Sequence, residues 1–109
     1  MSVRLVVDFR LKTGAREELT RAYHDLAQVA GRQPGLIEHQ LCQSLDDPDR
    51  WLVISEWETL DASTSWDRSD DHRRLLAPMR ACFEQASRAA FEIRDGVDRD
   101  RPSPGAVTS

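Results

Sequence analysis

The stretch that most constrains the fold is residues 3–11, VRLVVDFRL, in which apolar side chains occupy every second position. Because successive side chains of a strand point to opposite faces, this pattern predicts a strand with one wholly apolar face. That face carries Val3, Leu5, Val7, Phe9 and Leu11, and the other carries Arg4, Val6, Asp8 and Arg10. The apolar face is expected to pack against helices, and the other to be wet or to line a polar cavity.

The rest of the chain alternates between the period of a helix and that of a strand. These patterns predict a helix from the Thr13 cap to about residue 29, strands at 36–44 and 51–57, helical segments at 61–66 and 72–86, and a strand at 89–94. Thr13 is expected to cap the first helix, and Thr59 and Ser69 the later two. Pro78 predicts a kink or break near Ala77. The turn LDDPDR predicts a hairpin between the middle strands.

The order of these elements is β-α-β-β-α-β, which predicts an α+β, ferredoxin-like fold with a four-stranded antiparallel sheet. Helices on one face of such a sheet leave the other face to solvent or to a partner. Trp51, Val53 and Trp57 alternate on one side of their strand and are expected to make that second face too apolar for water. A homodimer that packs sheet against sheet is therefore predicted.

Length and composition limit the possible classes of protein. A chain of 109 residues predicts one domain, residues 1–95, and a flexible charged and proline-rich tail, residues 96–109. No apolar run approaches the length of a membrane span, and no signal peptide precedes the first strand, so a cytoplasmic protein without membrane contact is expected. The net charge of −4 argues against nucleic acid as a partner. Cys42 and Cys82 lack metal-site spacing and are expected to be free thiols.

The segment SLDDPDRWLVISEWETLDASTSWDRSDDHRRLL resembles the antibiotic biosynthesis monooxygenase domain. The resemblance is carried by an aspartate-rich turn before a hydrophobic strand ending in Glu-Trp-Glu, and by the S-x-x-H run from Ser69 to His72. It implies a dimeric α+β barrel with a pocket between sheet and helices. The best-known members oxidise aromatic polyketide anthrones with molecular oxygen, using neither metal nor flavin. The resemblance therefore implies no cofactor.

Two positions depart from the patterns of the family. The anthrone oxygenases have a strand asparagine four residues before the tryptophan that Trp57 matches, and this chain has Val53 there. Members that degrade haem have a histidine at the position of Leu76, so haem degradation is disfavoured.

His72 and Trp66 are the predicted catalytic pair. Histidine is the most plausible base near neutral pH, and the family places a functional residue where Trp66 stands. Either residue can equally be a packed residue of an amphipathic helix. His24 is expected to be exposed to solvent.

Five more residues are predicted to bind substrate: Trp57, Val53, His39, Asp8 and Arg10. His39 either points into the pocket or bonds to a neighbour. Arg10 could pair with a substrate oxyanion, but Asp8 and Arg10 could equally form cross-strand ion pairs. Trp51 is expected at the rim of the domain or at a dimer contact.

Together these observations predict a cofactor-independent monooxygenase acting on an aromatic polyketide-type intermediate, anthrone or phenolic, in secondary-metabolite biosynthesis. Val53 favours an alternative, a non-oxygenase polyketide cyclase or a protein that binds a small aromatic ligand in the same pocket. A third interpretation is an interaction module without a pocket.

Overall fold

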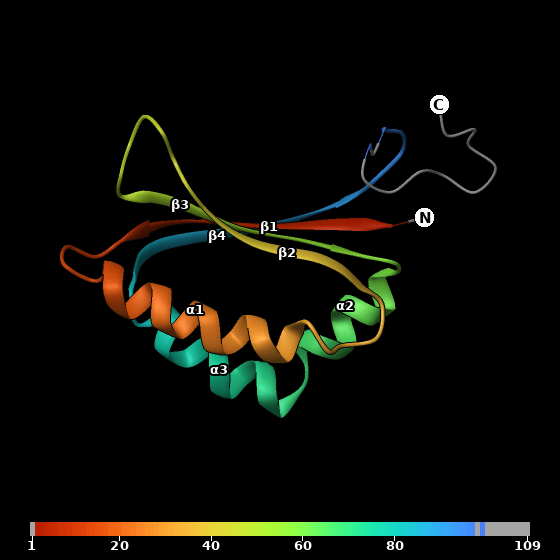
Figure 1. The fold of residues 1–109 in the computed structure, drawn as a ribbon, viewed down its shortest axis with the longest axis horizontal. Helices are drawn as coiled ribbons and strands as arrows, with labels where there is room; N and C mark the ends of the chain where they lie inside the picture. The colour runs from red at the N-terminus through yellow and green to blue at the C-terminus, as the bar shows by residue number, and fades with distance from the viewer. Residues whose placement is uncertain (1, 98, 100–109) are drawn as a thin grey trace.

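The computed structural model describes residues 2–97 and 99, and these form one antiparallel sheet covered on one face by three helices (Figure 1). The elements are β1 (Val3–Leu11), α1 (Arg16–Ala30), β2 (Leu36–Gln43), β3 (Arg50–Trp57), α2 (Leu60–Asp67), α3 (Asp70–Arg80) and β4 (Phe83–Glu92). The strands lie in the order β2-β3-β1-β4. The predicted α+β, ferredoxin-like fold is confirmed, with a short extra helix before α3. The predicted tail, residues 96–109, lies mostly outside the described residues.

The apolar row of β1 faces the helices, as its alternation predicts. Leu5, Phe9 and Leu11 are buried in the core. Phe9 pairs with Trp51 across the ladder, and Val3 pairs with Trp57. Because directly paired residues share a face, both tryptophans lie on the helical side of the sheet.

The placement of the β3 tryptophans corrects two predictions. Trp51 and Trp57 are 5% and 1% exposed, so they belong to the core and not to the outer face of the sheet. Trp51 is neither a rim residue nor a dimer contact. Its indole N–H donates to the carbonyl of Pro48 at 3.1 Å, and the guanidinium of Arg16 lies 5.9 Å from the ring centroid.

The outer face of the sheet carries the other half of each alternation. Val6, Leu52 and Ile54 are only partly buried there, and Phe91 is 56% exposed. Arg4 and Glu56 form an ion pair at 3.1 Å on the same face. This face is therefore a partly apolar surface with charges around it, as the pattern of β1 indicates.

The helix boundaries follow local capping chemistry only in part. Thr59 accepts a hydrogen bond from the N–H of Ala62, and Ser69 accepts one from the N–H of His72, so both predicted caps are confirmed. The cap predicted at Thr13 is wrong: α1 has Ala15 at its N-cap position, without a side-chain bond. Glu17 and Glu18 still place negative charge near the N-terminal end of α1.

The last third of the chain departs most from the prediction. Helix α3 continues through Pro78 but ends at Arg80, so the helix predicted to reach residue 86 is too long. Cys82 and Phe83 continue the apolar spacing of the helix, which misled the prediction. In the structure Phe83 begins β4 and pairs with Leu11. The free edge of β1 thus gains a strand where local sequence favours helix.

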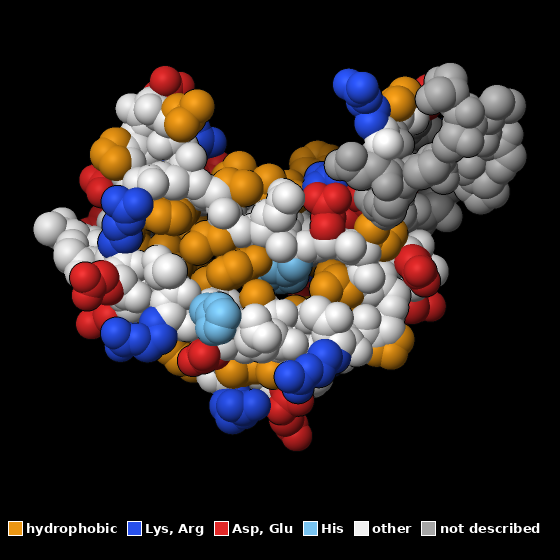
Figure 2. All heavy atoms as spheres, in the orientation of Figure 1, with side chains coloured by type: hydrophobic (Ala, Val, Ile, Leu, Met, Phe, Trp, Pro, Cys, Tyr) orange, Lys and Arg blue, Asp and Glu red, His pale blue; other side chains and the backbone are white. Residues whose placement is uncertain are grey.

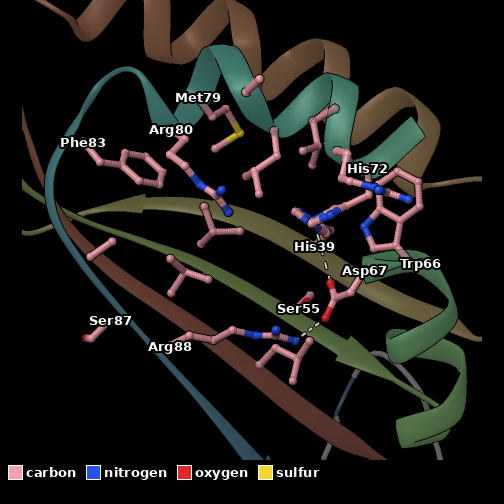
Figure 3. Close-up of a pocket in the computed structure, with 18 of the residues that line it drawn as sticks. His39, Ser55, Trp66, Asp67, His72, Met79, Arg80, Phe83, Ser87 and Arg88 are labelled. Atoms are coloured by element: carbon pink, nitrogen blue, oxygen red, sulfur yellow. Dashed lines mark hydrogen bonds and ion pairs between the residues drawn. The ribbon is translucent and has the colours of Figure 1, made fainter. Parts of the chain in front are cut away.

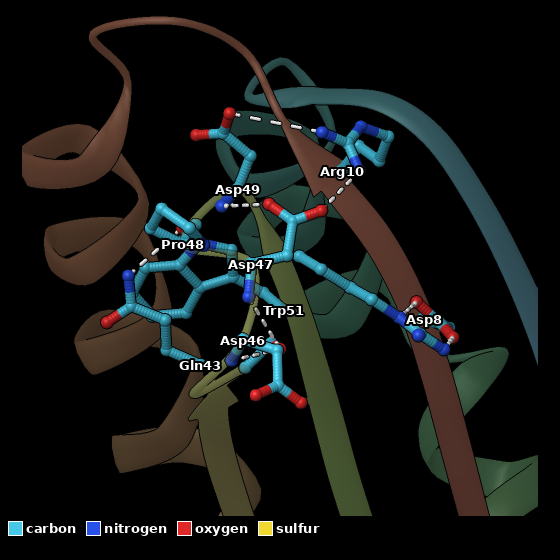
Figure 4. A network of polar contacts seen from close by, with 10 residues as sticks. Asp8, Arg10, Gln43, Asp46, Asp47, Pro48, Asp49 and Trp51 are labelled. Carbon is cyan, nitrogen blue, oxygen red and sulfur yellow. Dashed lines mark hydrogen bonds and ion pairs between the residues drawn. The ribbon is translucent and has the colours of Figure 1, made fainter.

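Two polar contacts hold the ends of the sheet. At the β2–β3 hairpin, Asp47 accepts hydrogen bonds from Arg10 at 2.9 Å and from the N–H of Asp49 at 3.0 Å (Figure 4). At the opposite end of β1, the N–H of Ile93 donates to the carbonyl of Ser2 at 2.9 Å. The described chain therefore begins and leaves the sheet at neighbouring points.

Gly35 is the residue that lets the chain pass from α1 to β2 beside α2. Its φ is +87°, a conformation that residues with a Cβ rarely adopt. A Cβ at this position would lie 2.7 Å from the Cβ of Ala62. The close approach of α2 to the β2 entry thus depends on glycine.

Candidate active site

A cavity of about 830 Å³ lies between the sheet and α3 and extends to β4. Its apolar wall includes Leu5, Val7, Val53, Trp57, Trp66, Leu76, Met79 and Phe83, and its polar lining includes His39, Ser55, Asp67, His72, Arg80 and Arg88. Figure 3 shows these side chains converging from α2, α3 and the strands. Figure 2 shows a histidine among hydrophobic side chains in a recess between the helices and the sheet. The sheet and α3 therefore enclose a pocket and not a uniform core.

Trp66 and His72 meet at one end of the cavity. Their rings contact edge to face, with centroids 5.2 Å apart, and Trp66 is only 4% exposed. Ser69 holds both residues: its hydroxyl donates to the carbonyl of Trp66 at 2.7 Å and accepts from the N–H of His72 at 3.1 Å. The turn between α2 and α3 thus fixes the distance between the two predicted catalytic residues.

Asp67 connects three elements around this end of the cavity. One carboxylate oxygen lies 3.7 Å from Nε2 of His72, and the other accepts a hydrogen bond from Arg88 of β4 (Figure 3). Burial lowers the pKa of His72, and the Asp67 carboxylate opposes that shift. His72 is therefore held in a cluster with a carboxylate and a guanidinium.

His39 lines the cavity from β2 and bonds to Tyr23 of α1. The hydroxyl of Tyr23 lies 2.9 Å from Nδ1 of His39. Burial, with a smaller effect of His72, lowers the pKa of His39 to about 4. Burial, with a smaller effect of Cys42, raises the pKa of Tyr23 to about 12. Both groups are therefore neutral near pH 7.

Trp57 and Val53 form part of the cavity wall on β3. The indole N–H of Trp57 donates to the hydroxyl of Ser55 at 3.1 Å, so this donor is already used within the protein. Val53 pairs with Val7 on one side and with Leu41 on the other. The position that is asparagine in anthrone oxygenases is thus an apolar part of the wall here.

Asp8 and Arg10 do not reach the cavity. Both lie on the outer side of β1, where Asp8 accepts two hydrogen bonds from Arg50 and Arg10 bonds to Asp47 (Figure 4). The Arg50 guanidinium holds the pKa of the Asp8 carboxyl below its usual range. Of the two interpretations left open by the sequence, the ion pairs agree with this placement. His24 is exposed on α1, as predicted.

The sequence predictions missed several polar residues in or next to the cavity: Ser55, Asp67, Arg80 and Arg88 line it, and Tyr23 bonds to the lining residue His39. Tyr23 fits the apolar stripe of α1 and was assigned only to the core. Arg88 lies one residue before the predicted start of the last strand, inside the actual β4. Asp67 directly follows Trp66 at the end of a short helix, and this position next to a predicted catalytic residue is the signal that could have identified Asp67 as a cavity residue.

The ferredoxin-like domain thus encloses a cavity with aromatic and aliphatic walls and two histidines in its lining. Cavities of this composition are the usual binding sites for small organic molecules in proteins. The model of the family described as antibiotic biosynthesis monooxygenase matches residues 2–77. The chain belongs to this family, and the resemblance inferred from the hairpin and the S-x-x-H run is confirmed.

Two relatives of the chain come from Streptomyces species, and one of them is named a polyketide synthase. The chain is 32% identical over 107 residues to the 42.8 kDa protein in the whiE locus of Streptomyces coelicolor, covering 98% of this chain and 27% of that protein. It is 31% identical over 105 residues to polyketide synthase CurD of Streptomyces cyaneus, covering 96% of this chain and 26% of that protein. The chain thus spans about a quarter of the length of these curated relatives.

Among solved structures, SnoaB, a cofactor-independent oxygenase from Streptomyces nogalater, superposes with a TM-score of 0.79 at 23% identity, covering 88% of this chain and 96% of that one. At this identity the likeness establishes the fold. In the described part of the chain, none of the helices is both long and apolar enough to cross a membrane.

Proposed function

We propose that the chain is a cofactor-independent monooxygenase that acts on an anthrone-like or phenolic aromatic polyketide intermediate. The observation that carries the proposal is the cavity itself: its walls are aromatic and aliphatic, and His39 and His72 line it together with Trp66. The family membership and the relative CurD of Streptomyces cyaneus, which is named a polyketide synthase, support a substrate from polyketide biosynthesis.

The chemistry needs an electron-rich substrate. Direct reaction of a closed-shell molecule with triplet oxygen is spin-forbidden, so the substrate first loses a proton and the resulting anion donates one electron to oxygen. In the overall reaction of an anthrone, one oxygen atom becomes the new carbonyl and the other leaves as water. The two hydrogens of that water come from the oxidised carbon, so no external reductant is required.

The cavity residues suit three parts of this reaction. A neutral cavity histidine accepts the phenolic proton; the sequence favours His72, and His39 also lines the cavity. The guanidinium of Arg88 places positive charge near the polar end, where a substrate oxyanion is stabilised. Trp66 and Trp57 exclude water from the anion.

A second candidate function follows from Val53. An apolar wall at this position offers no amide to the substrate oxygens, which favours a non-oxygenase cyclase or a binding protein that holds an aromatic intermediate in the same cavity.

The experiment is oxygen uptake by metal-free protein with anthrone and hydroquinone substrates, with product mass measured in parallel. We expect faster uptake than in buffer and a product that carries one new oxygen atom. Binding without uptake, or a product isomeric with the substrate, would select the second candidate instead.

We also propose a homodimer formed through the outer face of the sheet. The partly buried Val6, Leu52 and Ile54 with the exposed Phe91 give this face an apolar centre, although the tryptophans first assigned to it lie on the other side. Light scattering at micromolar concentration should give the mass of two chains, and Ile54→Asp should give the mass of one. A monomeric mass for the unmodified protein would contradict the dimer.

A further inference from the structure

Tyr23 and His39 form a hydrogen-bonded pair between α1 and β2. Tyr23 lies on α1 and His39 on β2, and their side chains meet at 2.9 Å between the helix layer and the sheet. His39 also lines the cavity, and Tyr23 is only partly buried. The pair therefore joins a cavity residue of β2 to a partly exposed residue of α1.

The two nitrogens of His39 have different surroundings. Nδ1 is occupied by the hydroxyl of Tyr23, and within residues 2–97 and 99 no protein group forms a hydrogen bond with Nε2. A phenol can accept a hydrogen bond from Nδ1–H while it donates its own hydrogen elsewhere. With the proton on Nδ1, Nε2 carries a lone pair that is available to a ligand in the cavity.

His72 is held differently. Its Nε2 faces the carboxylate of Asp67 at 3.7 Å, and Asp67 also binds Arg88. Its ring is fixed edge-on against Trp66. These contacts suit a residue that orients the substrate beside a charged cluster, and they leave His39 as the histidine without a charged partner in the cavity.

We propose that His39 is the base that removes the phenolic proton of the substrate and that Tyr23 carries this proton to solvent. The inference rests on the proposed oxygenase function and assigns its proton-transfer step. The substrate O–H bond breaks and its electron pair stays on the substrate oxygen, while the proton joins Nε2 of His39. The Nδ1 proton passes to the Tyr23 oxygen, and the original hydroxyl proton of Tyr23 passes to water.

The surroundings of Tyr23 and His39 favour transfer of the proton to solvent over its retention on His39. Burial keeps the pKa of His39 near 4, so an imidazolium at this position is unfavourable. The titratable groups near His39 are its partner Tyr23 on α1 and His72 on α3, and Cys42 on β2 lies near Tyr23. None of these three groups is a carboxylate that would hold the proton on His39.

The first experiment measures oxygen uptake with a phenolic substrate for His39→Gln, Tyr23→Phe and the control His24→Gln, a histidine exposed on the same helix as Tyr23. We expect His39→Gln to lower kcat by roughly 10²-fold or more, the typical share of a general base. Tyr23→Phe should lower kcat less and leave KM nearly unchanged. Raising the pH above the pKa of the substrate phenol should restore both variants, because an ionised substrate needs no base.

Wild-type kcat in His39→Gln, or a loss that high pH does not restore, would overturn the inference. So would a loss of activity in His72→Gln that high pH restores, with His39→Gln unaffected. A second experiment needs no oxygen chemistry: 4-nitrophenol is bound to each protein, the pH is raised rapidly, and the rate at which the phenolate colour appears is measured. Wild type and His24→Gln should deprotonate the bound phenol faster than His39→Gln does; equal rates in all three would refute His39 as base even if the oxygenase proposal fails.

Discussion

Replacing Asp67 with asparagine should loosen the wall that β4 forms around the cavity. Asp67 is the acceptor that Arg88 reaches from β4, and β4 is otherwise held mainly by its ladder with β1. The side chains of Asp67 and Arg88 are 23% and 53% exposed. Removing the carboxylate charge therefore removes a partly screened link between the edge strand and α2.

The size of the effect follows from this exposure. Two unit charges about 4 Å apart attract by about 1 kcal/mol in water and about 4 kcal/mol near a protein surface. Because Arg88 is more than half exposed, the lower value applies, and the lost stability should be about 1 kcal/mol. For a domain of this size, such a loss lowers Tm by about 4–8 °C. His72 adds little at pH 7.5, since burial lowers its pKa and keeps it neutral.

The assay is thermal unfolding of a double-mutant cycle with Asp67→Asn and Arg88→Gln. The coupling energy should be about 1 kcal/mol at low salt and should shrink at about 1 M salt, where exposed charges are screened. Asp70→Asn is the control, because Asp70 is fully exposed in its pair with Arg73 and should change Tm little. Strictly additive effects of the two substitutions at low salt would refute the reasoning.

Three further predictions test other parts of the structure. Trp66→Phe should lower activity on the aromatic substrate more than His24→Ala, because only Trp66 borders the cavity; equal losses would undermine the site. The free energy of unfolding should fall by up to about 3 kcal/mol as the pH drops from about 6.5 to about 4, because His39 binds a proton in the unfolded state and stays neutral in the folded state. In His39→Gln, the denaturant midpoint should no longer depend on pH in this range to the same extent. An unchanged pH dependence would contradict the lowered pKa of His39. Gly35→Ala should lower Tm more than Gly14→Ala, since both have positive φ but only Gly35 faces an α2 side chain; equal losses would count against the contact.

A strand and its buried side could be predicted where apolar and polar residues alternate clearly within that strand. The alternation of residues 3–11 predicts β1 with its boundaries and its buried side, because one face is wholly apolar. The face of Trp51 and Trp57 was assigned wrongly, because register with β1 is a contact between distant residues and neither strand contains it alone.

The end of α3 and the start of β4 show a second limit. Residues 83–92 contain little apolar alternation, and the strand forms because β1 has an open edge to fill. The sequence of residues 83–92 alone does not indicate that β1 has an unpaired edge. The start of β4 was therefore predicted too late in the chain, and Arg88 was missed as a cavity residue.

The cavity itself was predicted better than its polar partners. Trp66 and His72 are close in sequence and are joined by a capped turn, so their contact follows from local structure. The bond between Tyr23 and His39 joins α1 to β2, and neither periodicity indicates it. Local sequence thus predicts the contact between Trp66 and His72, whereas the contact between Tyr23 and His39 depends on tertiary packing.

The bond between Ile93 and Ser2 makes this fold a candidate for circular permutation. The two residues directly flank the paired ends of β1 and β4, so a short linker would join residue 93 to residue 2 in a domain cut at these positions, and closing a short loop costs little entropy. New termini could be opened at Leu45, which is fully exposed in the β2–β3 hairpin. The same proximity would let the domain be inserted into a surface loop of another protein through a single point of attachment.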